Sequence, residues 1–325
     1  MKKLTIVIPA YNAIDTISQT LYSILMQTKN DEVKCIIVDD CSEYSYEEIV
    51  NKFSNLLEIE LIRLKVNQGP SYARNEGLRR VQTPYVMFMD ADDNLIHPYV
   101  IEKLMTPLLE DEKGYMIVSN FIEQGEENNL VRIVEEDYIW VFGKIYKTDY
   151  LKKHNIYFGQ YNQNEDTAFN MECRLAATAN DYIYTLHDVT YSWNFRENAI
   201  TKKNNAEYTF TTSSIGAIGN IRNVLKKYKN NINDNEFYYS NLLKYLISGY
   251  YSYNQMLIIK NGYDKPLLKE LQLYYKELID HDDIIFNNPY IDFSEIYTQI
   301  SISHYTLPYN LIQITFQDFL NLLKK

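Results

Sequence analysis

Short apolar runs alternate with helical segments along the first 120 residues of this chain. The runs are rich in Val, Ile and other apolar residues and occupy residues 4–8, 35–38, 59–64, 85–89 and 115–119. Between them, apolar residues recur at the three- and four-residue spacing of a helix. Strands alternating with helices, with largely apolar strands, predict a mostly parallel sheet that helices cover on both faces. We therefore expect an α/β fold.

Residues that interrupt these patterns predict where the elements begin and end. Pro9 follows the first run and predicts the end of that strand. A helical stripe starts at Ile14, and Asn12 or Asp15 is the candidate for its N-cap. Further helices are expected around residues 49–53, 71–80 and 98–109.

Carboxylates follow two of the predicted strands directly. Asp39 and Asp40 close the second run, and Asp90 and Asp92 come just after the fourth. In open α/β sheets, ligands bind at the carboxyl ends of the strands. We therefore expect these four side chains to face one crevice.

Asp90-Ala91-Asp92 suggests a divalent metal site. Hard carboxylate oxygens can hold Mg²⁺ or Mn²⁺ and, through the ion, a diphosphate. The alternative is an acidic turn that water solvates, and the position after a strand favours the metal. Asp93 is expected to cap the next turn rather than to bind the ion.

The other clusters suit the rest of a nucleotide. Asp39 and Asp40 could accept hydrogen bonds from a base or ribose, or cap the following helix with Ser42; we expect one Asp to do each. Arg74 suits a phosphate or a base carbonyl, with a surface salt bridge as the alternative. Asn67 and Gly69 are expected to shape the loop before it.

A second acidic pair lies far downstream. Glu165 and Asp166 precede an amphipathic run, where a carboxylate is commonly a helix cap. The same position suits a general base that faces an acceptor. The residues alone leave these two interpretations open.

Composition excludes several classes of protein. A formal net charge of −11 argues against a nucleic-acid groove, which needs a basic stripe. Three cysteines without metal or disulfide spacing fit the reducing cytosol. We expect neither a signal peptide nor a transmembrane span, although contact with the inner face of a membrane stays open.

Together these clusters resemble those of glycosyltransferase family 2, which has the GT-A fold. Each short piece is weak evidence, whereas the ordered set, over about residues 4–201, is specific. The matching segments are 9–12, 38–42, 67–75, 90–93, 143–147, 165–166 and 191–201.

The resemblance implies an inverting transferase that uses a nucleotide sugar, usually a UDP-sugar, and Mn²⁺ or Mg²⁺. It implies that Asp92 binds the metal and that Asp166 deprotonates the acceptor hydroxyl. Glu165 and Lys144 are assigned to the acceptor. The residues assigned to the nucleotide sugar are Pro9, Ala10, Tyr11, Asn12, Asp39, Asp40, Asn67, Gly69, Arg74, Asp90, Ala91 and Arg196.

The chain departs from the family pattern at several positions. Cys41 stands where the family often has Gly, Asn194 where it has Arg, and Ala199 where it has Ser. Arg196 stands where a His or an Arg is found, which favours a diphosphate contact there over a His ligand. Whether the nearby His187 takes part stays open, with a structural role favoured.

Residues 206–325 have a different, helical pattern rich in Tyr, Asn and Lys. We expect a catalytic domain over 1–205, with a nucleotide-sugar half at 1–120 and an acceptor half at 121–205. The helical region after it is expected to dock on that domain, to bind acceptor or to join protomers of a homo-oligomer. Its aromatic residues could stack on sugars, but core packing is favoured.

The predicted function is transfer of a sugar from a UDP-sugar to a glycan, cell-surface polymer or glycoprotein. A nucleotidyltransferase is disfavoured, because residues 9–12 lack the Gly-rich, basic loop that such enzymes have after the first strand. A non-catalytic protein that keeps the fold is the other alternative. Loss of the metal or base carboxylate would favour it, and both are present here.

Overall fold

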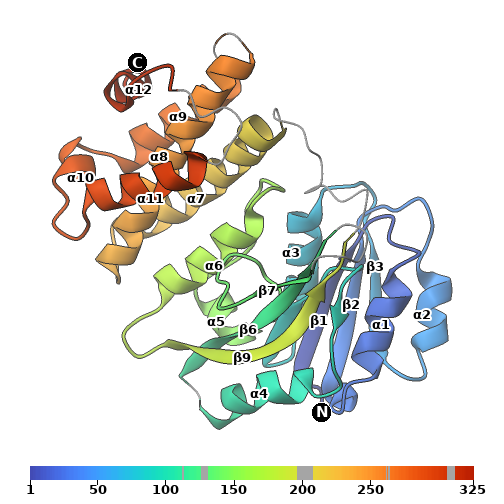
Figure 1. Ribbon diagram of the computed structural model, residues 1–325. Coiled ribbons are helices and arrows are strands. Elements are labelled where there is room, and N and C mark those ends of the chain that lie inside the picture. Colours follow the sequence, from blue (N-terminus) through green and yellow to red (C-terminus); the bar gives the residue numbers. More distant parts are fainter. Residues whose placement is uncertain (112, 126–130, 196–207, 261, 263, 306–311) are drawn as a thin grey trace. The chain divides into compact units, whose positions relative to one another are not determined.

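A computed structural model describes residues 1–325 except 112, 126–130, 196–207, 261, 263 and 306–311 (Figure 1). The chain forms two compact units. The first, here called the sheet unit, comprises Met1–Phe158 and Ala177–Ala199. The second, the helical unit, comprises Gly159–Ala176 and Ile200–Lys325.

The sheet unit has one mixed sheet with the order β3-β2-β1-β4-β8-β6-β9-β5, and β7 pairs with β6. Strands β1 to β4 are mutually parallel, which confirms the expected α/β fold. Their bounds are β1 Leu4–Ala10, β2 Val33–Asp39, β3 Glu58–Arg63 and β4 Tyr85–Phe88. Because every residue of β4 and nearly all of β1 and β2 are buried, apolar residues dominate these strands.

Three helices cover this parallel part. Helices α1 (Ile17–Leu25) and α2 (Glu47–Phe53) lie side by side on one face of the sheet, and α3 (Pro70–Arg80) lies on the other (Figure 1). Right-handed crossovers produce this arrangement, since the strand order runs outward from β1 to β3 and then returns to β4. Gly77 allows α3 to lie close to β1, because a Cβ there would stand 2.3 Å from Val7 Cγ1.

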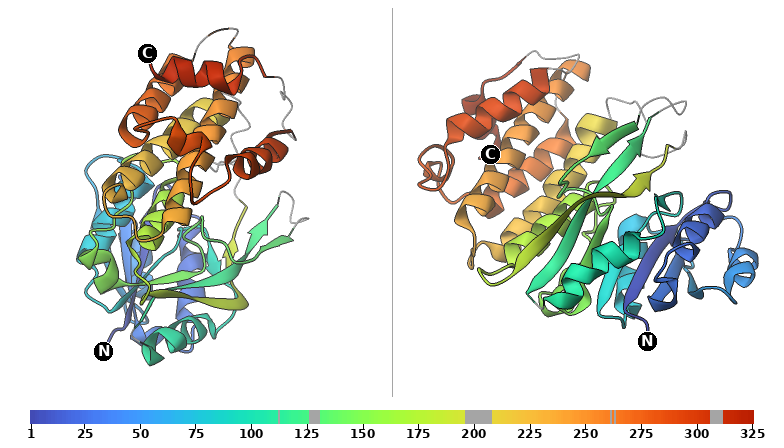
Figure 2. Two further views of the ribbon diagram at one scale, coloured as in Figure 1. Left: turned by 90° about the vertical axis from the view of Figure 1, so that its left-hand side faces the viewer. Right: turned by 60° about the horizontal axis from the view of Figure 1, so that its bottom comes forward.

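The second half of the sheet continues with antiparallel neighbours. β8 joins β4 to β6, and β6 runs parallel to the long β9, as Figure 2 shows. The remaining elements of this unit are β5 Asn94–Leu95, α4 Val100–Glu110, β6 Gly114–Gln124, β7 Val131–Val134, β8 Lys144–Lys147, α5 Thr148–Lys153 and β9 Tyr182–Trp193.

The helical unit has its own apolar core. Leu242 and Leu246 of α8, Leu271 of α9 and Phe319 of α12 are fully buried in it, so the helical stripes of this region pack on one another. The helices are α6 Glu165–Ala176, α7 Ser214–Tyr228, α8 Asn235–Ile259, α9 Lys265–Leu278, α10 Asp283–Phe286, α11 Phe293–Tyr305 and α12 Phe316–Leu323. None of the described helices is long and apolar enough to cross a membrane.

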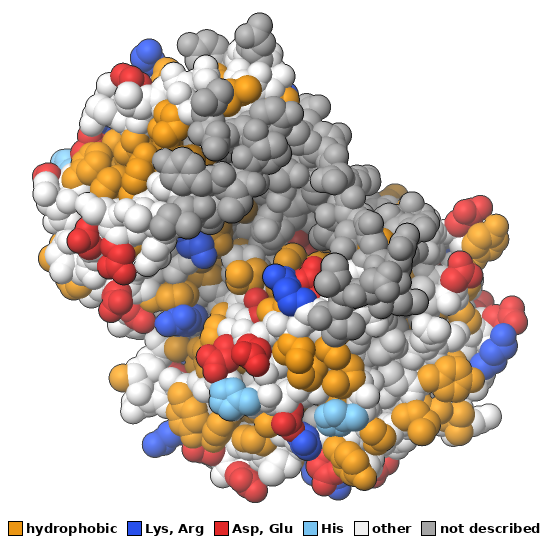
Figure 3. All heavy atoms as spheres, viewed as in Figure 1, with side chains coloured by type: hydrophobic (Ala, Val, Ile, Leu, Met, Phe, Trp, Pro, Cys, Tyr) orange, Lys and Arg blue, Asp and Glu red, His pale blue; other side chains and the backbone are white. Residues whose placement is uncertain are grey.

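Charged side chains of both signs are interspersed on the face that Figure 3 shows. Charged residues of the two units form surface ion pairs, such as Lys103 with Asp188 and Lys52 with Glu48. Exposed pairs of this kind contribute at most about 1 kcal/mol each. The two units are therefore stabilised mainly by their buried apolar residues.

Three predictions about boundaries differ from the structure. Pro9 lies within β1 rather than after it. The pairing of β1 with β4 ends at Val7, so the missing N–H of Pro9 removes no hydrogen bond between these two strands. The first helix begins at Ile17 with Thr16 as its N-cap, so neither Asn12 nor Asp15 caps it. The chain also crosses between units before residue 205, because α6 belongs to the helical unit.

Candidate functional site

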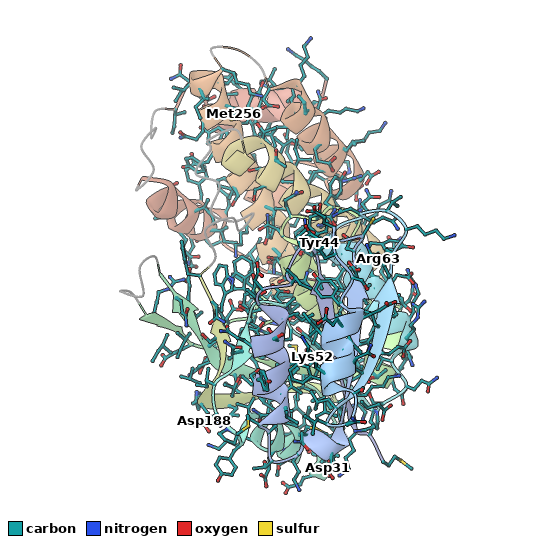
Figure 4. The ribbon with its side chains drawn as sticks, turned by 90° about the vertical axis from the view of Figure 1, so that its right-hand side faces the viewer. Asp31, Tyr44, Lys52, Arg63, Asp188 and Met256 are labelled. Carbon is teal, nitrogen blue, oxygen red and sulfur yellow. The ribbon has the colours of Figure 1, made fainter. Side chains whose placement is uncertain are left out.

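The carboxyl ends of the parallel strands meet at one edge of the sheet unit. Figure 4 shows Arg63, at the end of β3, and Tyr44, after β2, at this edge, with Asp31 at the opposite one. Asp39 ends β2, and Asp90 lies two residues after the end of β4. The structure thus brings the predicted nucleotide residues of these strands to one edge, where α/β proteins bind ligands.

Asp39 keeps one carboxylate oxygen without a hydrogen bond. Its Oδ1 accepts from the amide of Ser42 at 2.8 Å. Its Oδ2 is buried and lies 3.2 Å from Nη1 of Arg63 as an ion pair, but without the angle of a hydrogen bond. A buried carboxylate oxygen with unused acceptor capacity suits a donor N–H or O–H of a ligand.

Asp40 holds the loop before α3. Its two oxygens accept from the amides of Gln68, at 2.8 Å, and Gly69, at 2.6 Å. Burial raises the pKa of Asp40 above its usual value, even though these hydrogen bonds act in the opposite direction. The predicted helix-capping role is wrong, because Tyr46 is the N-cap of α2 and makes no side-chain cap bond. Gly69 has a φ of 86°, a value that only glycine adopts easily, and Asn67 is exposed beside it.

The loop after β1 is tied to the loop after β2. The amide of Asn12 donates to Ser42 Oγ at 3.0 Å, and Asn12 Oδ1 accepts from the amide of Glu43 at 2.9 Å. Ala10 is buried at the strand end, whereas Tyr11 is 51% exposed and its ring is available to a ligand. Cys41 has a φ of 64°, which explains in physical terms why Gly is common there in the family.

Arg74 is a buried residue of α3, so the predicted alternative of a surface salt bridge is wrong. Its side chain is 4% exposed, and Nη2 donates to Asp90 Oδ1 at 2.8 Å. The guanidinium also lies 5.3 Å from the ring centre of Phe158. Arg74 therefore places a positive charge beside the carboxylates that follow β4.

Asp90, Asp92 and Asp93 offer carboxylate oxygens that lie within 4.8 Å of one another. Asp93 is fully buried, and burial and then its two acidic neighbours raise its pKa well above the usual value. A divalent cation would relieve this crowding of like charges, so the donor set fits Mg²⁺ or Mn²⁺. Both Asp93 oxygens accept hydrogen bonds within the protein, from the Tyr191 hydroxyl and the amide of Asn194.

Tyr191 of β9 and Asn194, which follows this strand, bind the acidic loop. The sequence did not predict this role. The Tyr191 hydroxyl donates to Asp93 Oδ2 at 2.6 Å and accepts from the amide of Asp90 at 3.2 Å. Asn194 Nδ2 donates to the carbonyl of Asp92 at 2.7 Å, and its amide donates to Asp93 Oδ1 at 2.9 Å. The sequence feature that could have indicated this role is Asn194, because it stands at the position where the family usually has Arg.

Other predicted residues lie elsewhere. Lys144 is fully buried in β8 and pairs with Asp137 at 3.2 Å, so its ammonium already has a counter-ion. His187 is exposed and lies 3.5 Å from Glu136. Arg196 lies outside the described residues. Glu165 and Asp166 begin α6 in the helical unit, and their predicted roles stay predictions.

The chain is similar to known proteins in sequence and in structure. The family model described as "Glycosyl transferase family 2" matches residues 5–162. A poly(ribitol-phosphate) beta-N-acetylglucosaminyltransferase, TarS of Staphylococcus aureus, is 31% identical over 207 residues, which are 59% of this chain and 35% of that protein. A poly(ribitol-phosphate) beta-glucosyltransferase of Bacillus spizizenii is 30% identical over 191 residues, 54% of this chain and 30% of that protein. The chain thus spans about a third of the length of these relatives.

A solved structure shares the whole fold. The crystal structure of S. aureus TarS 1–349 in complex with UDP-GlcNAc superposes with a TM-score of 0.70, over 97% of this chain and 95% of that one. The sequence identity in this superposition is 19%, so the likeness speaks for the fold. It covers both units, including the helices beyond the residues that the family model matches.

Proposed function

Residues 5–162 belong to glycosyl transferase family 2, and we propose that this chain is a glycosyltransferase that acts on a carbohydrate polymer. The donor is a UDP-sugar, and the acceptor is a hydroxyl of a polymer such as a teichoic acid. The names of both relatives support the polymer, since each acts on poly(ribitol-phosphate). Their different sugars, N-acetylglucosamine and glucose, leave the identity of the transferred sugar to experiment.

One observation carries this proposal: a buried arginine, paired with the first carboxylate of an acidic loop, at the edge where β1, β2 and β4 end. Arg74 supplies a fixed positive charge for a diphosphate, and a guanidinium matches phosphate oxygens in a planar fork. Asp39 Oδ2 offers an acceptor for the uracil or ribose at the neighbouring strand end. Arg74 would thus bind the diphosphate end of the nucleotide, and Asp39 would bind the nucleoside end.

Asp90 and Asp92 would hold a divalent ion, Mn²⁺ or Mg²⁺. When bound, the ion neutralises the charge that develops on a departing diphosphate. Asp93, Tyr191 and Asn194 keep the two carboxylates in place, because their hydrogen bonds fix the backbone of this loop.

The proposed reaction is a single displacement with inversion. Asp166 takes the proton of the acceptor hydroxyl, and the oxygen attacks C1 of the sugar as the bond from C1 to the diphosphate breaks. UDP leaves, and the new glycosidic bond has the opposite configuration. The support for Asp166 is its match to the family's base position at the start of a helix.

A panel of nucleotide sugars tests this function. Purified protein is incubated with Mn²⁺, a poly(ribitol phosphate) acceptor and one of several UDP-, GDP-, CDP- or dTDP-linked sugars, and the released nucleoside diphosphate is measured. The proposal predicts release of UDP from at least one UDP-sugar. UDP binding without any release would favour the non-catalytic alternative. In a parallel incubation with UTP and a sugar 1-phosphate, formation of pyrophosphate would favour a nucleotidyltransferase.

A further inference from the structure

Four aromatic rings pack together next to the acidic loop of the sheet unit, and three of them are stacked. Trp140 and Phe142 are parallel, with ring centres 5.8 Å apart, and Phe142 and Tyr191 are nearly parallel at 5.2 Å. Trp193 packs against Trp140 at 5.3 Å and against Phe142 at 5.5 Å. Phe142 and Tyr191 are buried, whereas the two tryptophans are only half-buried. We call these four residues the aromatic stack.

The aromatic stack is connected to the proposed metal site at its buried end. The Tyr191 hydroxyl donates to Asp93, and Asn194, the residue after Trp193, bonds the carbonyl of Asp92. The half-buried end of the stack, formed by the two indoles, therefore lies at a fixed distance from Asp90 and Asp92. A ligand on the indoles would have a defined position relative to the diphosphate.

Trp140 is held by a rigid turn. The amides of Trp140 and Ile139 donate to Asp137 Oδ2, at 2.8 and 3.1 Å. The same oxygen lies 3.2 Å from the ammonium of Lys144, which is fully buried. Burial of an ion pair costs desolvation free energy, which good geometry and further hydrogen bonds must offset. The ion pair between Lys144 and Asp137 holds the turn that contains Trp140. Lys144 would therefore support acceptor binding without touching the acceptor.

We propose that Trp140 and Trp193 form a stacking surface for a carbohydrate unit of the acceptor polymer. The face of an indole is electron-rich and packs well against the C–H groups of a sugar or polyol. Partly buried tryptophans are typical anchors of binding surfaces, because they bury a large area with little loss of side-chain entropy. This inference rests on the proposed function.

The order of strands in the sheet suggests that the ligand on Trp140 and Trp193 is the acceptor rather than the donor. The predicted nucleotide residues belong to β1, β2 and α3, and the acidic loop follows β4. The stack belongs to β9 and to the segment before β8, on the other side of β4 in the order β3-β2-β1-β4-β8-β6-β9-β5. Since the transferred sugar adjoins the diphosphate at the acidic loop, the indoles serve the next carbohydrate unit beyond it.

Intrinsic fluorescence tests binding directly, because Trp140 and Trp193 are the two tryptophans of the chain. Trp193→Phe leaves Trp140 as the reporter, and Trp140→Phe leaves Trp193. The probes are ribitol 5-phosphate, N-acetylglucosamine, maltopentaose and a poly(ribitol phosphate) chain, each added to protein that is saturated with UDP and Mn²⁺. The proposal predicts that at least one probe changes the emission of both variants, and no change with any probe overturns it.

Kinetics separate this inference from the proposed function. Trp140→Ala should raise the acceptor KM about tenfold, the size of one stacking contact, and leave the UDP dissociation constant unchanged. Trp140→Phe should recover most of the loss, and Tyr99→Ala, at an exposed aromatic residue before α4, is the matched control. An unchanged acceptor KM overturns the inference while turnover persists. Failure of wild-type protein to bind UDP would overturn the proposed function instead, and a probe-induced change in emission measured without UDP would still support the stacking surface.

Discussion

At the scale of single residues, Arg74 and Asp39 contribute most to the proposed nucleotide pocket. Arg74 is buried and has a carboxylate partner, so its guanidinium has a fixed position before any ligand arrives. Asp39 has a buried oxygen that forms an ion pair with Arg63 but no hydrogen bond, so it can still accept one from a ligand. Both features support the proposal that a nucleoside diphosphate binds at the carboxyl edge of the sheet.

Replacing Arg74 should weaken UDP binding. Arg74→Lys keeps the charge but loses the planar fork, and Arg74→Ala loses both, so affinity should fall in that order. Loss of a buried, charge-assisted hydrogen bond corresponds to about 1.5–3 kcal/mol. Titration calorimetry with UDP and Mn²⁺ measures it, and Arg79→Ala, at an exposed residue of the same helix, is the control. An unchanged dissociation constant in both Arg74 variants would remove Arg74 from the nucleotide pocket.

Asp166→Asn separates chemistry from donor binding. The amide keeps the shape of the side chain but cannot take a proton, so turnover should fall by about 10² or more. The UDP dissociation constant should change little, since a base faces the acceptor. Lost UDP binding with intact turnover at saturating donor would make Asp166 a donor ligand and would require a different base.

At the scale of elements, the start of α6 is fixed by α7 within the helical unit. Asn220 of α7 bonds the segment before α6 three times, to the amide and carbonyl of Tyr161 and to the carbonyl of Gln163. Gly219 and Gly216 allow this close approach, because a Cβ at either would meet Tyr161 or Gln163 at 2.4 and 2.8 Å. The helix that carries Asp166 therefore depends on α7 for its position.

Asn220→Ala should lower turnover and leave donor binding intact. The substitution removes all three bonds to the segment before α6, whereas the predicted nucleotide residues belong to the sheet unit. Steady-state kinetics should show a fall in kcat of about tenfold or more, with an unchanged UDP dissociation constant. Asn241→Ala removes one bond within α8 and is the matched control. Equal kcat values for the two variants would contradict a positioning role for Asn220.

Strands β1, β2, β4 and β6 were predictable from the sequence because their burial leaves a continuous apolar signal. The half-buried β3 was also predicted, whereas β5, β7, β8 and β9 were not. Each of the five predicted strands exists within two residues of its expected start. Partners that come from distant segments leave no such signal. Asp40 binds a loop 28 residues away, and Tyr191 binds an aspartate 98 residues away, so neither contact follows from local spacing. For the same reason, Asn12 was expected as a helix cap although its partner is Glu43.

At the scale of the whole molecule, the chain crosses between its two units more than once. α6 packs into the helical core through Ala168, Met171 and Leu175, and Glu172 pairs with Lys227 of α7. Single-sequence patterns show where helices are, but they do not show which core a given helix joins. The predicted boundary at residue 205 therefore separated α6 from the helices that bury it.

Truncation after Thr201 should give an unstable protein. The shortened chain keeps α6 but loses α7, α8 and α9, so the apolar face of α6 becomes exposed. Exposed faces of this kind lead to aggregation. Size-exclusion chromatography and thermal unfolding measure the outcome. A soluble, monomeric fragment with full activity on the natural acceptor would show that the helical unit has another purpose.

The dependence of UDP release on metal tests the central claim, that Asp90 and Asp92 hold the ion that binds the donor diphosphate. UDP release from the active UDP-sugar is measured for wild type and Asp92→Ala, with EDTA and then with excess Mn²⁺ or Mg²⁺. We expect EDTA to abolish release by wild type and added metal to restore it. Asp92→Ala should remain folded, with an unchanged unfolding temperature, and show no release in either condition. Full activity of Asp92→Ala in the presence of EDTA would contradict the claim.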